Sequence, residues 1–156
     1  MNRWLIGALR VILACGLAGS VFVQVVMVPL FAQDLAEAGA PEMLRVWIPV
    51  ILVLGIVTIQ VAMVCVWRLL TMVSKGTVFS LAAFRWVDVI VVSALCAALL
   101  CFALGLVLAP TEVPPGVVLL IGGAGGLAVG VALVVLVMRA LLAQAAGLRD
   151  ELEGVV

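Results

Sequence analysis

Asp88 is the residue of this sequence whose type and position most clearly offer chemistry, because it is an acid inside a long apolar stretch. An ionisable group at the centre of a membrane costs about 2.5 to 3.5 kcal/mol on insertion scales, so it needs a partner or a function. Arg85 lies three residues earlier, on the same face of a helix, and Arg139 lies near the end of another apolar stretch. We interpret Asp88 as part of an intramembrane ion pair with Arg85 or Arg139. A proton-binding or ligand-binding role is the alternative.

Uncharged polar side chains inside the apolar stretches form a second candidate site. At a rise of about 1.5 Å per residue, Gln60 and Ser93 are both roughly 12 Å from the nearest arginine of their own segment. Gln24 lies nearer the other membrane surface. Such side chains, together with Ser20 and Thr58, are able to hydrogen-bond between membrane helices. Gln60, Ser93 and Gln24 are also compatible with a small polar pocket.

Nucleophilic, redox and metal chemistry lack their usual residues. The chain has four cysteines and no histidine, and none of the cysteines forms a Cys-x-x-Cys pair. A buried cysteine behaves as a small apolar side chain. We therefore expect no catalytic residues, no metal, no cofactor and no enzymatic activity.

The composition indicates which elements must position these residues. Of the 156 residues, 68% are hydrophobic and 10% are charged, against roughly 45 to 50% and about 25% in soluble domains. Eight Lys and Arg balance eight Asp and Glu. These values exclude an ordinary soluble enzyme, and the balance of charge argues against direct binding of nucleic acid. They indicate a small integral membrane protein with the lipid bilayer as its partner.

The charged residues leave four long uncharged runs. They contain 23, 22, 23 and 26 residues, and about 20 apolar residues suffice to span a bilayer as a helix. The sequence predicts an all-α integral membrane four-helix bundle, a single membrane domain over 1–156. We expect helices at about 5–31, 46–73, 81–109 and 116–147.

The cationic residues predict the orientation, because those near helix ends stay in the cytoplasm. With the N-terminus inside, seven of the eight lie on the cytoplasmic side and Arg45 lies outside. We therefore expect a multi-pass protein of the cytoplasmic membrane with both termini in the cytoplasm.

The connection between the second and third helices has the sequence pattern of a helix N-terminus. Ser80 is a suitable N-cap, and Phe79 before it is placed to pack on Phe84 as a hydrophobic staple. Gly76, after Lys75, permits the turn. We expect these residues to form a cytoplasmic turn.

Glycines recur on the fourth helix at a spacing of four, at Gly122, Gly126 and Gly130. Such a face admits another helix at close range. The expected neighbour is either the first helix, through Cys15 and Gly19, or a second protomer, so a homo-oligomer is one possible state.

The turn and the helix layout resemble those of a bacterial family of small four-helix membrane proteins that is known as a domain of unknown function. Members typically have a Lys-Gly-x-x-Phe-Ser/Thr turn between helices two and three, which Lys75, Gly76, Phe79 and Ser80 match. The resemblance covers nearly the whole chain. Because members are often encoded beside a small Cro-type helix-turn-helix regulator, it implies a membrane protein that controls a cytoplasmic transcription factor. It implies no catalytic residues.

Three function classes follow. The first is a non-enzymatic regulator or sensor with a cytoplasmic transcription-factor partner, for which the acidic C-terminal stretch offers a docking segment. The second is a small-molecule transporter, although the first helix has no carboxylate of the kind that four-helix multidrug exporters use. The third is an accessory subunit of a membrane complex.

Overall fold

The computed structural model describes residues 3–75 and 81–154, and the regular structure there is all helical. The elements are α1 (Arg3–Phe22), the π-helical turn η1 (Val23–Met27), α2 (Val28–Glu37), α3 (Glu42–Ser74), α4 (Leu81–Leu108) and α5 (Pro115–Gly154). Four segments are long and apolar enough to cross a membrane, and α1, η1 and α2 together make the first of them. The expectation of an all-helical chain with four spanning helices is confirmed.

Several helices extend beyond the uncharged runs from which they were expected. The first span continues to Glu37 instead of ending near 31, α3 begins at Glu42 instead of near 46, and α5 reaches Gly154 instead of ending near 147. Glutamate and arginine are good helix formers. The backbone hydrogen bonds of each helix therefore continue past its apolar run, where the chain reaches the polar interface.

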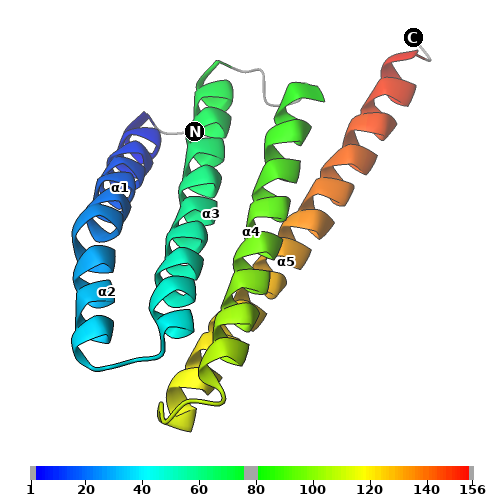
Figure 1. The fold of residues 1–156 in the computed structure, drawn as a ribbon. Helices are drawn as coiled ribbons and strands as arrows, with labels where there is room; N and C mark the ends of the chain where they lie inside the picture. Colours follow the sequence, from blue (N-terminus) through cyan, green and yellow to red (C-terminus); the bar gives the residue numbers. More distant parts are fainter. Residues whose placement is uncertain (1–2, 76–80, 155–156) are drawn as a thin grey trace.

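The helices form an open row and do not close around one core (Figure 1). The first span packs on α3, α3 packs on α4, and α5 packs along α4, so the first span and α5 lie at opposite ends of the row. The four-helix bundle expected from the sequence is corrected in this respect. Lipid is as apolar as leucine, so no hydrophobic gain drives the two outer helices together.

A narrow stripe of the first span makes the contact with α3. Up to Val28, its less exposed residues are Ile6, Arg10, Leu13, Leu17, Ser20, Gln24 and Val28. The number of residues from one to the next alternates between four and three up to Gln24, and the last step, from Gln24 to Val28, is again four. A helix that packs along its length on another keeps a repeat of 3.5 residues. The second step of four adds one residue to this repeat, and it falls within η1.

Pro29 explains the position of this extra residue. A proline inside a helix lacks an amide hydrogen, and its ring clashes with the carbonyl group four residues earlier. The Val28 N–H donates to the carbonyl oxygen of Val23, five residues back, which widens the turn before the proline. Local π-helical turns of this kind let membrane helices accommodate proline. The first span therefore continues to Glu37 with its contact face still on α3.

The glycines of α5 separate into one that is packed and several that are open. A β-carbon at Gly125 would lie 3.1 Å from Cys101 Cβ and 3.2 Å from the Phe102 ring, both on α4. A β-carbon at Gly122, Gly126 or Gly130 would meet nothing within 4 Å. The expected packing of this face on Cys15 and Gly19 of the first helix is therefore not found, because α5 packs on α4 instead. Gly125 makes the close approach.

We expect Gly125→Leu to destabilise the fold and Gly126→Leu to leave the monomer nearly unchanged. The larger side chain at 125 must displace Cys101 and Phe102, and overpacking of this kind costs about 1 to 3 kcal/mol. Thermal unfolding in detergent, followed by tryptophan fluorescence, measures the difference. Equal melting temperatures for the two variants would contradict the assignment of Gly125 to the α4–α5 contact.

Candidate functional site

Asp88 of α4 forms its ion pair with Arg139 of α5. Arg139 Nη2 donates to Asp88 Oδ2 at 2.9 Å, and Arg139 Nε lies 2.5 Å from Asp88 Oδ1. The second approach lacks hydrogen-bond geometry and is therefore an ionic contact. The side chains are 48% exposed for Asp88 and 36% exposed for Arg139. The pair thus lies on the side of the α4–α5 contact, where it joins these two helices.

Phe84 and Arg85 occupy different places beside this pair. The Arg139 guanidinium carbon lies 5.8 Å from the centre of the Phe84 ring, one turn before Asp88, within the range of a cation–π contact. Arg85, the other expected partner of Asp88, is exposed and pairs with no acid among the residues that the structure describes. Arg139 reaches the carboxylate from α5, so Arg85 is left free.

Gln24 and Gln60 meet between the first span and α3, whereas Ser93 lies elsewhere. Gln60 Nε2 donates to Gln24 Oε1 at 2.8 Å and to Ser20 Oγ at 3.0 Å. Gln24 Nε2 approaches the Val53 carbonyl oxygen at 3.4 Å. Ser93 is buried on α4 and donates to Ile90 of its own helix at 2.8 Å. The expected pocket of Gln60, Ser93 and Gln24 is corrected to a hydrogen-bonded cluster of Gln60, Gln24 and Ser20.

Ser20 was expected to bond between helices but not to join Gln60 and Gln24 in a pocket, although the spacing of Ser20 and Gln24 contains this signal. Ser20 and Gln24 are four residues apart and therefore lie on one face of a helix. Gln24 lies in η1, and π-helical turns are frequent at functional sites. The described contacts use the polar groups of the cluster for helix packing.

The turn after α3 is described in part. Lys75 caps α3, and its N–H points to the carbonyl oxygens of Thr71 and Met72 at 3.3 and 3.2 Å. Gly76, Phe79 and Ser80 lie outside the described residues, so the expected N-cap and staple stay predictions.

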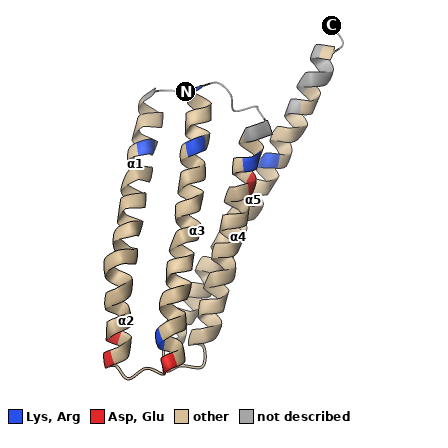
Figure 2. Ribbon diagram, turned by 45° about the horizontal axis from the view of Figure 1, so that its top comes forward, with Lys and Arg blue, Asp and Glu red and all other residues tan. Residues whose placement is uncertain are grey.

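Arg10, Arg68 and Arg85 lie on the first span, α3 and α4, each toward the end of the molecule that carries the termini, where Figure 2 shows cations on these helices. Arg10 Nη2 lies 3.5 Å from Thr71 Oγ1 of α3. The Arg68 guanidinium carbon lies 5.7 Å from the centre of the Trp86 ring of α4, next to Arg85. We call Arg10, Arg68 and Arg85 the arginine cluster. Its members share one membrane end because each lies at the same end of its apolar run.

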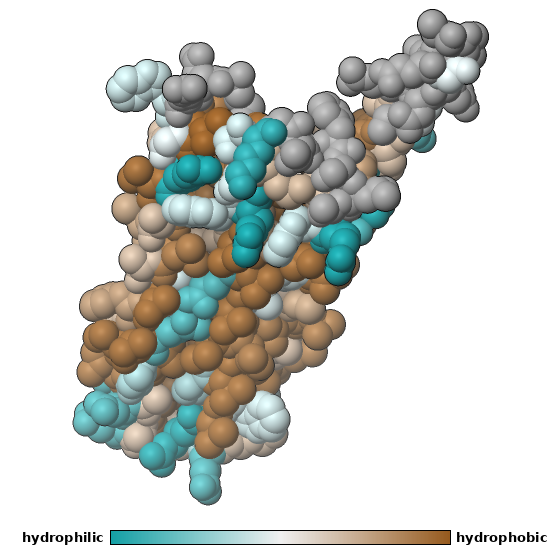
Figure 3. Space-filling model, turned by 90° about the horizontal axis from the view of Figure 1, so that it is seen from above, coloured by the Kyte–Doolittle hydropathy of each residue, from teal (hydrophilic) through white to brown (hydrophobic). Residues whose placement is uncertain are grey.

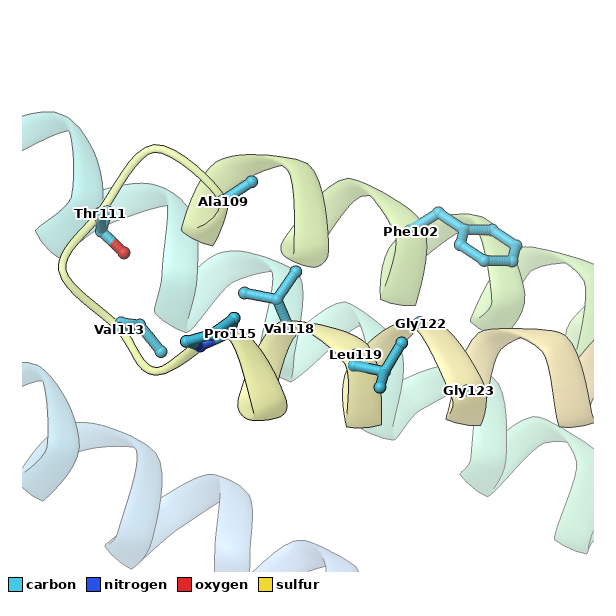
Figure 4. Close-up of a pocket in the computed structure, with 9 residues that line it drawn as sticks. All are labelled: Phe102, Ala109, Thr111, Val113, Pro115, Val118, Leu119, Gly122 and Gly123. Atoms are coloured by element: carbon cyan, nitrogen blue, oxygen red, sulfur yellow. The ribbon is translucent and has the colours of Figure 1, made fainter.

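Two cavities of the described residues are lined mainly by apolar side chains. One, of about 860 Å³, lies by the turn between α4 and α5, where Phe102, Val118, Leu119 and Gly122 line it (Figure 4). Its hydroxyl group, on Thr111, donates to the Leu108 carbonyl oxygen at 2.6 Å. A second cavity, of about 460 Å³ between α3, α4 and α5, is lined by apolar side chains and Arg139. No three His, Cys, Asp or Glu side chains among the described residues could hold a metal ion together.

We expect Asp88→Asn and Arg139→Gln to lower the melting temperature in detergent. Each leaves one group without its partner, at a cost of about 1 to 2 kcal/mol, between the values for exposed and buried pairs. The double variant should lose less than the sum of the single variants. Asp34→Asn, at an exposed acid of the other membrane end, is the matched control and should melt as the unchanged protein does. Additive losses would show that the pair is not coupled.

We expect Gln60→Met to destabilise the contact between the first span and α3. Methionine has a similar length and makes neither of the two hydrogen bonds of the Gln60 amide, and an interhelical hydrogen bond in a membrane contributes about 0.6 kcal/mol on average. Ser93→Ala is the control, since its hydroxyl group bonds within α4. Melting in detergent compares the two. A larger loss for Ser93→Ala would contradict the assignment of the polar contact to Gln60.

Comparison with known proteins places the chain in a family. No curated protein and no solved structure matches it. One family model, described as Protein of unknown function (DUF2975), matches residues 3–156. The match covers all four spans, and it agrees with the resemblance stated from the turn after α3. The chain therefore belongs to the family of proteins of unknown function DUF2975.

Proposed function

We propose that this protein is a non-enzymatic regulator or sensor of the cytoplasmic membrane that acts through a soluble transcription-factor partner. Both termini lie in the cytoplasm in this proposal. The partner contacts the C-terminal end of α5, which continues past the apolar part of this helix.

The distribution of cations supports the orientation. The described cations Arg10, Arg68, Lys75, Arg85 and Arg139 lie toward the end of the molecule where the chain starts and ends, and Arg45 lies at the opposite end with Asp34, Glu37 and Glu42 (Figure 2). Cationic residues near helix ends favour the cytoplasmic side. This end of the molecule therefore faces the cytoplasm.

The length of α5 is the observation that carries the proposal. The uncharged run of α5 ends at Met138, and the helix continues through Arg139 to Gly154. Its last nine residues, 146–154, form an extension of roughly 13 Å at about 1.5 Å per residue. Figure 1 shows this end of α5 diverging from α4 and standing apart from the other helices. The extension thus offers a surface to a protein in the cytoplasm.

The sequence of the extension indicates the charge of the partner. It contains Asp150, Glu151 and Glu153 against the single cation Arg149. An acidic segment attracts a basic partner and raises its rate of association. DNA-binding proteins carry such basic surfaces, and the family resemblance implies a neighbouring helix-turn-helix regulator. The acidic charge of the extension and the family resemblance thus favour the same kind of partner.

The ion pair and the polar cluster favour regulation over transport. Asp88, the acid within a spanning segment, is engaged by Arg139 on the side of the α4–α5 contact. The polar groups of Gln24 and Gln60 bond to each other and to neighbouring helix groups. Transport sites usually present an ionisable group to a water-filled path. Here these groups hold helices together.

Co-purification from membranes tests the proposed contact. The full chain is expressed together with the genes that flank its own, and the membrane protein is captured in detergent. The expected partner is a helix-turn-helix protein among the proteins recovered with it. Neutralising the extension with Asp150→Asn, Glu151→Gln and Glu153→Gln should reduce recovery of the partner several-fold, because the charge that attracts it is removed.

The control variant neutralises one Asp and two Glu at the opposite end of the molecule, by Asp34→Asn, Glu37→Gln and Glu42→Gln. It should leave recovery unchanged. A truncation after Ala145, which keeps the whole span, should abolish recovery. Equal recovery with all of these chains would refute docking on α5.

The open glycine face of α5 favours one second candidate function, that of an accessory subunit. Gly126 and Gly130 are exposed, and nothing in the described chain lies where their β-carbons would be. Another membrane helix can approach closely on such a face. Gly126→Leu should then remove a membrane-embedded partner or a second protomer while the monomer keeps its melting temperature, as blue native electrophoresis would show.

A further inference from the structure

We propose that the arginine cluster binds the phosphate headgroup of an anionic phospholipid in the leaflet on the side of the chain termini. The proposal concerns the faces of the first span, α3 and α4, whereas the proposed partner contacts the end of α5. It does not depend on that partner.

Contacts across three helices bring the cluster together. Arg10 of the first span reaches Thr71 of α3, and Thr71 lies three residues after Arg68, on the same face of the helix. Arg68 lies over Trp86 of α4. Arg85 lies one helical turn before Val89, which lines the same cavity as Trp86. The three arginines thus lie on neighbouring helices at one end of the row.

The arginine cluster has no counterion in the part of the chain that the structure describes. Among the residues that the structure describes, no carboxylate pairs with Arg10, Arg68 or Arg85. Asp88, the acid at this end of the spans, is bound by Arg139. Arg10 Nε is in addition buried without a hydrogen-bond partner. Cationic side chains at one end of a molecule create a positive potential that attracts anions, and phosphate is the anion that the guanidinium fork fits.

An apolar hollow directly below the cluster fits the acyl chain of the same ligand. A cavity of about 270 Å³ between α3 and α4 is lined mainly by valines, together with Gln60, Cys65 and Trp86. Trp86 therefore contacts both the hollow and Arg68. Val64, another lining residue, lies one helical turn before Arg68 on α3. A lipid whose phosphate lies at Arg68 would extend its chain into this hollow.

The surface has the polarity that a lipid requires. Figure 3 shows a surface that is mainly hydrophobic, with hydrophilic side chains at its two ends and in a short run between them. Val57, Val61 and Val89, which line the hollow, are themselves exposed. Basic sites between membrane helices on the cytoplasmic side recognise anionic headgroups. A soluble phosphate would use the arginines and leave the apolar hollow without a role.

Native mass spectrometry of the full chain in detergent tests the proposal. Phosphatidylglycerol and phosphatidylcholine with identical acyl chains are added in separate titrations. We expect the phosphatidylglycerol adduct to be retained about fivefold more strongly, and Arg68→Gln to reduce its retention by about fivefold, the effect expected for one cation at a membrane surface.

Arg45→Gln is the matched control, because it removes the same charge from the opposite membrane end, and it should bind phosphatidylglycerol as the unchanged protein does. Arg85→Gln removes an exposed member of the cluster and should weaken binding without disturbing the fold, so it replaces Arg68→Gln if that variant unfolds. Equal retention of the two lipids would overturn the proposal, as would an equal loss with Arg45→Gln and the cluster variants. Displacement of the lipid by excess inorganic phosphate would assign the site to a soluble anion and overturn its assignment to a phospholipid.

Discussion

The bilayer provides no water for hydrogen bonding, and it provides no hydrophobic gain when two helices meet. Each helix must therefore satisfy its own backbone, and a few polar or closely packed contacts decide which helices meet. Asp88 and Arg139 join α4 to α5, and Gln60 with Gln24 joins α3 to the first span. The open row of helices follows from this constraint, because no comparable contact joins α5 to the first span among the described residues.

The same constraint explains the π-helical turn. Pro29 removes a backbone donor within the first span, and the wider turn from Val23 to Val28 accommodates it. The extra residue keeps Val28 on the face toward α3 after Gln24. The π-helical turn therefore accommodates Pro29 and also keeps the contact face on α3. Without the extra residue, this face would turn away from α3 beyond Gln24.

An open row leaves surfaces that a closed bundle would bury. The arginine cluster crosses three helices at one membrane end, the glycines at 126 and 130 face outward, and α5 continues past its span. These surfaces differ in chemistry. The arginine cluster is cationic, the glycine face allows close packing, and the sequence at the end of α5 is acidic. They can therefore engage a lipid, another membrane helix and a cytoplasmic protein without competing. This arrangement suits a small protein that acts through its contacts with other molecules.

The sequence by itself determined the membrane class, the four spans and the need of Asp88 for a partner, because scarce charges are costly in lipid and mark where helices leave it. It did not determine the ends of the helices, since glutamate and arginine extend helices beyond the apolar runs. Tertiary structure decided that Arg139 and not Arg85 binds Asp88, that Ser20 and not Ser93 joins the glutamines, and that Gly125 carries the α4–α5 contact. Helical spacing places each of these residues on a face of its own helix. Which neighbouring helix that face meets depends on how the row packs, and spacing within one helix contains no information about it.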